Sequence, residues 1–265
     1  MNRLEEVRKF LEFDRQARFF IEPEQRYEAV RDRLFDVLNN YKPAVTVKAG
    51  LGSGRLVLDM ARQSKTYLAV VEPSWMLIQD FLRENAGDEA LGRIQIIPGD
   101  FHDFPVDYYK ADLLVCVDHL DIFDSSRSMD EFRRALQFEG IFFFAGVILR
   151  ADDLEGVYDD YKRLVFPLHN DYYLEEDFKT FMELKDFTFI KSMTTSFPKN
   201  LGEERASLQS YQGGLPGPKA EDFLREHGEE FRTLYGLDDA GNISEAYLIA
   251  YFMKNQAEEK ERERL

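Results

Sequence analysis

The sequence has few of the features that would indicate an exported or membrane-spanning protein. Its 265 residues include a single cysteine, Cys116, so no disulfide can form within the chain. Such cysteine usage is typical of a reducing compartment. No apolar run approaches the ~18 residues of a membrane span, and residues 1–6 lack the apolar stretch of a signal peptide. We therefore expect a cytoplasmic protein.

Basic residues are also in short supply. The chain has 34 Lys and Arg against 50 Asp and Glu, which gives a formal net charge of -16. Nucleic-acid binding depends largely on neutralising phosphates with Lys and Arg, and the sequence shows no compact basic cluster. The acidic field repels polyanions and acidic membrane surfaces. We expect a small-molecule substrate as partner, and neither nucleic acid nor a membrane.

Aromatic residues are plentiful. The sequence holds 23 Phe and 13 Tyr, and 44% of its residues are hydrophobic. Aromatic side chains bury large areas, so a sizeable core can form. Cys116 lies among Leu113, Leu114, Val115 and Val117, and we expect it in a buried strand because free cysteine usually behaves as a small hydrophobe.

Strand-like apolar segments alternate with helix-like segments along the chain. The middle segments are continuously apolar, as expected for parallel strands covered on both faces. This alternation predicts an α/β fold with a doubly wound sheet. The expected strands are residues 45–47, 67–71, 94–97, 112–117, 141–148, 187–195 and 246–253.

The flanking segments suggest additions to this core. Residues 3–40 have helical periodicity, with Tyr27, Val30 and Leu34 on one stripe after Pro23. Residues 197–218 are rich in Gly and Pro and predict a loop, followed by a helix at about 219–235. Further helices are expected at about 129–138, 152–164 and 174–184. The predicted organisation is an N-terminal helical cap (1–42), a Rossmann-like core (43–196), a loop-helix insertion acting as a cap (197–242), and the last strand with a charged tail (243–265).

The strongest local signal is the segment Val45-Thr46-Val47-Lys48-Ala49-Gly50-Leu51-Gly52-Ser53-Gly54, between a predicted strand and a predicted helix. Glycines let backbone N–H groups approach a ligand closely, and a helix start offers free donors. Glu72 lies 22 residues beyond Gly50, at the end of the next strand. A nucleotide-binding sheet places a ribose-binding carboxylate there.

The spacing Gly-x-Gly-x-Gly resembles the first motif of class I S-adenosylmethionine-dependent methyltransferases. The resemblance covers about residues 44–195 and the final strand. It implies a seven-stranded, mostly parallel sheet and S-adenosylmethionine as cofactor. By this likeness Gly50, Gly52 and Gly54 form the cofactor loop, and Glu72 binds the ribose. Asp100 accepts from the adenine amino group, Phe101 packs on the adenine ring, and Pro73 and Val117 belong to the same site.

Lys48 departs from the family pattern, which has Asp or Glu at the end of the first strand. A lysine there would repel the methionyl ammonium unless it turns to solvent or pairs with a nearby acid such as Glu72. It could also bind the cofactor's carboxylate. The leading hypothesis is methyl transfer to an oxygen, nitrogen or carbon of a small molecule. The alternative is a methyltransferase-like binding or regulatory protein without transfer activity. A dinucleotide oxidoreductase is disfavoured by the glycine spacing.

His119 is the candidate catalytic base, because it follows the fourth strand at the edge where open α/β sheets bind ligands. A structural histidine explains it equally well. Asp118, His169, Tyr172 and Tyr173 are candidates for the acceptor pocket, since tyrosines combine apolar area with a hydroxyl. No tight ligand spacing predicts a metal site.

Overall fold

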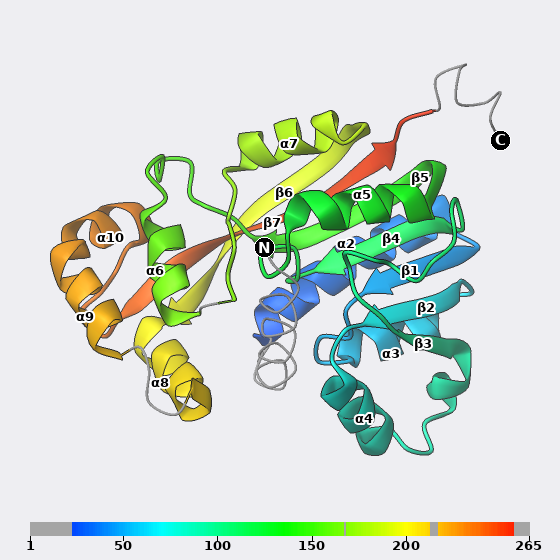
Figure 1. Cartoon of the computed structure of the whole chain (residues 1–265), viewed down its shortest axis with the longest axis horizontal. Helices are drawn as coiled ribbons and strands as arrows, with labels where there is room; N and C mark the ends of the chain where they lie inside the picture. Colours follow the sequence, from blue (N-terminus) through cyan, green and yellow to red (C-terminus); the bar gives the residue numbers. More distant parts are fainter. Residues whose placement is uncertain (1–22, 167, 213–216, 257–265) are drawn as a thin grey trace.

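The computed structural model describes residues 23–166, 168–212 and 217–256, and its centre is a seven-stranded sheet (Figure 1). The strand order is β3-β2-β1-β4-β5-β7-β6. β1 to β5 run parallel, and β7 is antiparallel to both of its neighbours. The predicted doubly wound, mostly parallel sheet is therefore confirmed. The strands are β1 (Val45–Ala49), β2 (Tyr67–Glu72), β3 (Ile94–Pro98), β4 (Ala111–Val117), β5 (Leu136–Val147), β6 (Phe187–Asn200) and β7 (Asn242–Lys254).

Helices cover both faces of the sheet, because alternate residues of a strand point to opposite sides. Leu113 and Val115 of β4 pack in one core cluster with α2 (Glu24–Tyr41), α3 (Arg55–Gln63) and α4 (Trp75–Glu84). Leu114 and Cys116 pack in the other with α5 (Ser125–Ala135) and α7 (Glu175–Leu184). Cys116 is fully buried, as expected, and burial raises the pKa of its thiol to about 12.

The apolar stripe predicted after Pro23 is confirmed as the buried face of α2. This helix belongs to the layer that covers the sheet, since its buried residues share a cluster with the strands. The first 22 residues of the expected cap lie outside the described residues. Ser74 caps α4 by accepting a hydrogen bond from Leu77 N at 3.1 Å.

The α5 helix ends three residues earlier than predicted, at Ala135. Its last carbonyl groups bond outside the helix, where Lys254 Nζ donates to Arg133 O at 2.6 Å and to Leu136 O at 2.7 Å. The backbone extends from Leu136 as β5. The contacts of Lys254 therefore accompany the end of α5 at Ala135, which the periodicity of the sequence predicted three residues later.

β6 and β7 extend past the rest of the sheet and carry a separate group of helices (Figure 1). We call this region the wing: helices α6 (Val157–Val165), α8 (Leu201–Gln212), α9 (Gly217–Glu226) and α10 (Gly228–Tyr235), residues 168–172, and the strand ends at 197–200 and 242–245. It has its own cluster of buried residues, including Tyr158, Phe231 and Tyr235.

The prediction of a loop over residues 197–218 is wrong for residues 197–212 and 217–218, while residues 213–216 lie outside the described residues. β6 continues to Asn200, and α8 follows at once. The Asn200 side chain accepts from Glu203 N at 3.0 Å and so begins the helix. Among the helix side chains that the structure describes, those of residues 201–206, Leu201 is the buried one, with 1% of its surface exposed. Gly and Pro content alone was therefore not enough to predict the secondary structure of this segment.

The order of strands positions the site. β1 has β2 on one side and β4 on the other, so the sheet has its topological switch point between β1 and β4. Ligands of open α/β sheets bind outside the carboxyl ends of the strands at such a point. Here these ends carry the glycine loop after β1 and Asp118 and His119 after β4.

Candidate functional site

The glycine loop adopts the backbone that its sequence predicts. Gly50, Gly52 and Gly54 all have positive φ values, of 80°, 59° and 76°. A side chain at Gly50 would overlap the ring of His119, and one at Gly54 would overlap the ring of Phe81. A side chain at Gly52 would meet nothing within 4 Å. Gly50 and Gly54 therefore permit close packing, while Gly52 leaves the backbone of the loop open to a ligand.

Glu72 lies at the end of β2 and is fully buried. Its carboxylate accepts from Leu51 N at 2.7 Å and from Ser74 N at 2.6 Å. This carboxylate therefore ties the glycine loop to the start of α4, with buried Pro73 between them. Hydrogen bonds of this kind to a charged group contribute about 1.5–3 kcal/mol. Binding of a ribose by Glu72 stays a prediction.

Asp100 and Phe101 follow β3 but have different surroundings. The Asp100 side chain is 45% exposed and accepts from His102 N at 3.0 Å. Phe101 is 1% exposed and packs edge-on against Phe123, with ring centroids 4.8 Å apart. Asp100 is thus accessible to a ligand, while Phe101 belongs to an aromatic cluster beneath the site. Their contacts with adenine stay predictions.

Lys48 points into the protein. The side chain is 2% exposed, and its Nζ donates to Gly50 O at 2.5 Å. The interpretation that placed this lysine in solvent is wrong. The ammonium group is therefore held against the backbone of the loop that the sequence assigns to the cofactor.

His119 packs beside this lysine and over Gly50. Its Nδ1 contacts the carbonyl oxygen of Val117, which can only accept, so Nδ1 carries the proton and Nε2 is the acceptor. Burial, followed by the positive charge of Lys48, lowers the pKa of His119 to about 4. The imidazole is therefore neutral at physiological pH, with a lone pair on Nε2.

Asp118 lies between Val117 and His119 and has a left-handed backbone, with φ of 55°. Asp is one of the few residue types that tolerate this conformation. Its carboxylate forms an ion pair with Arg26 of α2 at 2.8 Å. Arg26 also reaches Glu245 of β7 at 3.3 Å and lies over the ring of Tyr247. Two strand ends and a helix therefore meet at one guanidinium group.

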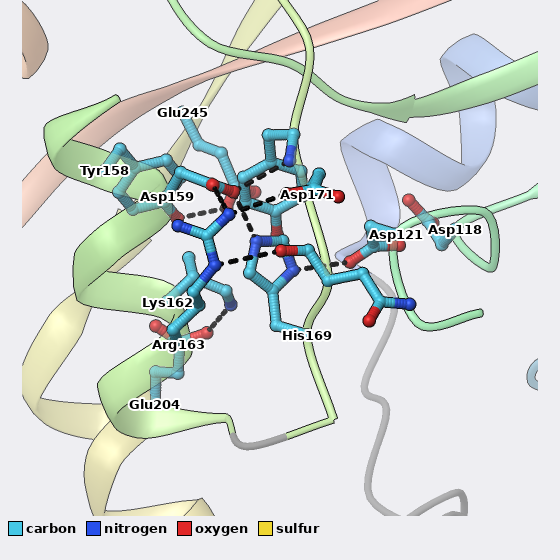
Figure 2. Close-up of polar contacts among 12 residues, drawn as sticks. Asp118, Asp121, Tyr158, Asp159, Lys162, Arg163, His169, Asp171, Glu204 and Glu245 are labelled. Atoms are coloured by element: carbon cyan, nitrogen blue, oxygen red, sulfur yellow. Dashed lines mark hydrogen bonds and ion pairs between the residues drawn. The ribbon is translucent and has the colours of Figure 1, made fainter. Parts of the chain in front are cut away.

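His169 and Tyr172 lie together in the wing, as Figure 2 shows for the histidine. The His169 ring is buried between Asp159, 2.6 Å from Nε2, and Asp121, 3.4 Å from Nδ1. Burial opposes its charged form, but hydrogen bonds to both aspartates outweigh burial and raise the pKa of His169. The Tyr172 ring lies 4.3 Å from the imidazole, centroid to centroid.

Tyr173 lies elsewhere. Its hydroxyl shares a hydrogen bond of 2.6 Å with Ser125, and its ring stacks on Phe181 of α7. The structure therefore brings His169 and Tyr172 together, whereas Tyr173 packs with the core cluster that contains α5 and α7.

A set of buried charges escaped the sequence analysis. Glu245 receives hydrogen bonds from Tyr158 and from Lys199 at 2.9 Å. Burial opposes its ionisation, but Lys199, Arg26 and Lys162 lower the pKa of Glu245 to about 2. Glu204 joins Lys199 to Lys162 (Figure 2 shows the Lys162 contact). Arg26 and Glu245 are 219 residues apart, and no local pattern marks either of them.

Within the described part of the chain, no group of three or more His, Cys, Asp or Glu side chains is arranged to hold a metal ion. No helix in that part is long and apolar enough to cross a membrane.

Comparisons with known proteins agree with this geometry. Residues 47–140 match the family model of the methyltransferase domain. This match spans the glycine loop, Glu72, Asp100 and His119. A comparison with curated proteins finds no sequence relative.

Similar solved structures have the same fold. The YcgJ protein of Bacillus subtilis is 13% identical, with a TM-score of 0.75 over 87% of this chain and 100% of its own. A putative methyltransferase of Bacillus halodurans is 11% identical, with a TM-score of 0.74 over 86% and 100%.

A third structure was solved with ligands. It is geranyl diphosphate C-methyltransferase of Streptomyces coelicolor, in complex with Mg²⁺, geranyl diphosphate and S-adenosylhomocysteine. It is 13% identical, with a TM-score of 0.58 over 87% of this chain and 79% of its own. Residues 47–140 thus match the methyltransferase domain, and these solved structures share the fold of the chain.

Proposed function

We propose that the chain transfers the methyl group of S-adenosylmethionine to a small-molecule acceptor, bound where the turn after β4 faces the wing. The observation that carries this proposal is the position of Asp118 and His119. His119 packs on Gly50 of the cofactor loop, while Asp118 bonds to Arg26 and through it to the wing. The turn that contains Asp118 and His119 thus connects the proposed cofactor site with the proposed acceptor site.

The residues present fit the cofactor at its adenosine end. Gly52 exposes the loop backbone, Glu72 holds the loop to α4, and Asp100 is accessible beyond β3. When bound, S-adenosylmethionine supplies an electrophilic methyl group on a sulfonium. Lys48 opposes this fit, because a second cation is costly in a poorly solvated site.

His119 is suited to receive a hydrogen bond from the acceptor. Its protonated Nδ1 is held by Val117 O, so Nε2 is the atom left to accept. Because the pKa of His119 is about 4, Nε2 stays unprotonated throughout the neutral range. It can therefore orient a hydroxyl or amine and take up its proton as the methyl group arrives.

The acidic surface favours a small acceptor over a polyanion. The wing and α2 would cover the acceptor once it is bound, so ligand should slow amide exchange in residues 24–41 and 197–242. Equal exchange with and without S-adenosylhomocysteine and acceptor would argue against a cover. The single, buried Cys116 favours a reducing location such as the cytoplasm.

Calorimetric titration with S-adenosylmethionine, S-adenosylhomocysteine and NAD tests the cofactor. We expect the first two to bind and NAD not to bind. Formation of S-adenosylhomocysteine across a panel of small alcohols, phenols, amines and carbon acids then tests transfer. Binding of NAD alone would contradict the proposal.

His119→Gln, with His102→Gln as a matched control, tests the base. Proton transfer by a positioned side chain contributes about 10²–10⁴-fold, so His119→Gln should lose turnover on that scale and keep cofactor affinity. His102 bonds to the backbone of Asp124 at 3.0 Å instead. Its replacement should leave turnover intact. Equal turnover in both variants would exclude His119 as the base.

A further inference from the structure

The turn after β4 has a strained backbone at Asp118. This residue has a φ of 55°, a left-handed conformation that is uncommon for residues other than glycine. A strained backbone persists only where the surrounding structure holds it in place. The contacts that hold Asp118 therefore also fix the residues on either side of it, Val117 and His119.

The position of the His119 ring depends on this conformation. Its Nδ1 contacts the carbonyl oxygen of Val117, two residues earlier in the chain. Its Nε2 lies against Gly50 of the cofactor loop. Because the contact between His119 and Val117 spans Asp118, a change in the Asp118 backbone would move the ring away from both Val117 and Gly50.

Arg26 of α2 holds the Asp118 side chain from outside the turn. Its guanidinium forms one ion pair with Asp118 at 2.8 Å and a second with Glu245 at 3.3 Å. The guanidinium carbon lies 4.5 Å from the centre of the Tyr247 ring, and the Tyr247 hydroxyl interacts with both Arg26 and Asp118. Arg26 therefore joins the turn to β7.

Arg26 is itself fixed by the wing. Glu245 is 2% exposed and also pairs with Lys199 at 2.9 Å, so the carboxylate that holds Arg26 has a fixed place. A guanidinium presents its N–H donors in a rigid planar fork, which a lysine ammonium cannot reproduce. Arg26 thus has the fixed position and the geometry needed to orient the turn.

We propose that Arg26 is a positioning residue of the transfer site, which keeps the turn at Asp118 in the conformation that places His119 over the cofactor loop. This inference rests on the proposed methyl transfer and assigns a role in it to a residue of α2. The wing, through Glu245 and Arg26, is then part of the framework of the site as well as a cover for the acceptor.

Arg134 of α5 supplies a matched control. Its side chain is 18% exposed, against 14% for Arg26, and it also forms an ion pair of 2.8 Å, with Glu131. Its guanidinium carbon lies 4.8 Å from the centre of the Tyr108 ring. Neither Glu131 nor Tyr108 belongs to the turn after β4. Arg134→Lys therefore removes a comparable set of contacts without touching this turn.

Histidine NMR tests the proposal without requiring activity. In protein with isotope-labelled histidine, the His119 signals are those missing from His119→Gln. We expect a proton on Nδ1 and a pKa of about 4, because burial and then the charge of Lys48 oppose the imidazolium. Arg26→Lys keeps the positive charge and loses the fork. In this variant the His119 ring should exchange between tautomers, and its pKa should rise towards the ordinary histidine value of ~6.5.

Turnover gives a second readout. A misplacement of about 1 Å can lower the rate about 100-fold, so Arg26→Lys should lose kcat on that scale with unchanged affinity for S-adenosylhomocysteine. Arg134→Lys should lower the Tm and leave both kcat and the His119 signals unchanged. Asp118→Asn is a second variant in case Arg26→Lys does not fold. Asn tolerates the left-handed backbone but loses the ion pair, so the His119 signals should change in the same direction.

Three results would overturn the proposal: His119 signals that stay unchanged in Arg26→Lys and Asp118→Asn, a wild-type ring with its proton on Nε2, or the same change in Arg134→Lys. Failure of methyl transfer itself appears separately, as absence of S-adenosylhomocysteine formation by the wild type. The NMR comparison then still decides whether Arg26 positions His119.

Discussion

The glycine-loop side of the sheet and the wing bury different chemistry. Around β1, β2 and β4 the interior is mainly apolar, with Lys48, Glu72 and His119 buried at the strand ends, and backbone contacts such as those of Glu72 shape the loop. In the wing, tyrosines surround charges that alternate from Arg26 through Glu245 and Lys199 to Glu204 and Lys162. The loop is therefore shaped mainly by backbone geometry, and the wing by side-chain electrostatics. The backbone geometry of the loop follows from the common fold, whereas the side-chain electrostatics of the wing are a feature of this particular chain.

The largest effect should come from breaking the wing's charge series. Glu245→Ala leaves Arg26 and Lys199 without their shared carboxylate, and removing one partner of a buried ion pair costs about 3–5 kcal/mol. Urea unfolding measures this loss. Glu229→Ala is the control, because Glu229 also pairs with an arginine but its side chain is 87% exposed. Similar stability in the two variants would remove the distinction between the wing and an ordinary charged surface.

A smaller effect is expected at the loop. Glu72→Ala should weaken S-adenosylmethionine binding by about 1.5–3 kcal/mol, the range for hydrogen bonds to charged groups. Calorimetry on the folded variant measures it. Asp112→Ala is a matched control, because Asp112 accepts from Val45 N at 2.8 Å at the opposite edge of the sheet. Asp112→Ala should lower the stability of the protein and leave cofactor affinity unchanged. If both variants bind the cofactor more weakly, the loss in Glu72→Ala comes from a less stable sheet and not from the loop.

The prediction of the sheet from sequence succeeded because its signals are local. Continuous apolar runs identified the parallel strands, and glycine spacing identified a loop that needs positive φ at three positions. The wing lacked such signals. The Arg26–Glu245 contact joins the first described helix to the last strand, and α8 is a polar helix whose start depends on the Asn200 cap. Side-chain pairing over such distances is set by the folded topology, which short-range patterns do not contain.

Substitution of Lys48 tests how a positive charge in the glycine loop affects cofactor affinity. If its ammonium repels the cofactor, Lys48→Asp should tighten S-adenosylmethionine by about 1–3 kcal/mol, and by more than S-adenosylhomocysteine, which lacks the sulfonium charge. If Lys48 instead serves a carboxylate of the cofactor or acceptor, the same change should weaken binding or abolish turnover. Lys48→Met separates the charge from the packing of the side chain. Binding without turnover in the unaltered protein would favour the alternative of a binding or regulatory role.

The smallest expected effect is a pH dependence in the wing. Asp121 and Asp159 raise the pKa of His169 above its unfolded value of ~6.5, with Arg163 as the other charge on Asp159. A raised pKa means that the stabilisation is fully present below pH ~6.5 and is lost as the pH rises through the folded pKa. The difference in unfolding free energy between the wild type and His169→Asn should therefore shrink on the alkaline side. A constant difference would show that His169 acts through packing alone.

The place of β7 in the sheet has a consequence for the time course of folding. This strand is last along the chain but lies between β5 and β6, so β6 has no partner strand, and β5 has only β4, until residues 242–254 have been synthesised. Chains emerge from the ribosome amino end first, and Arg26 and Lys199 are therefore made before the carboxylate that joins them. Contacts that form after the folding barrier change the unfolding rate more than the folding rate. If the Glu245 contacts form after the barrier, Glu245 should mainly lower the unfolding rate of the wing. Its effect on the folding rate should be small.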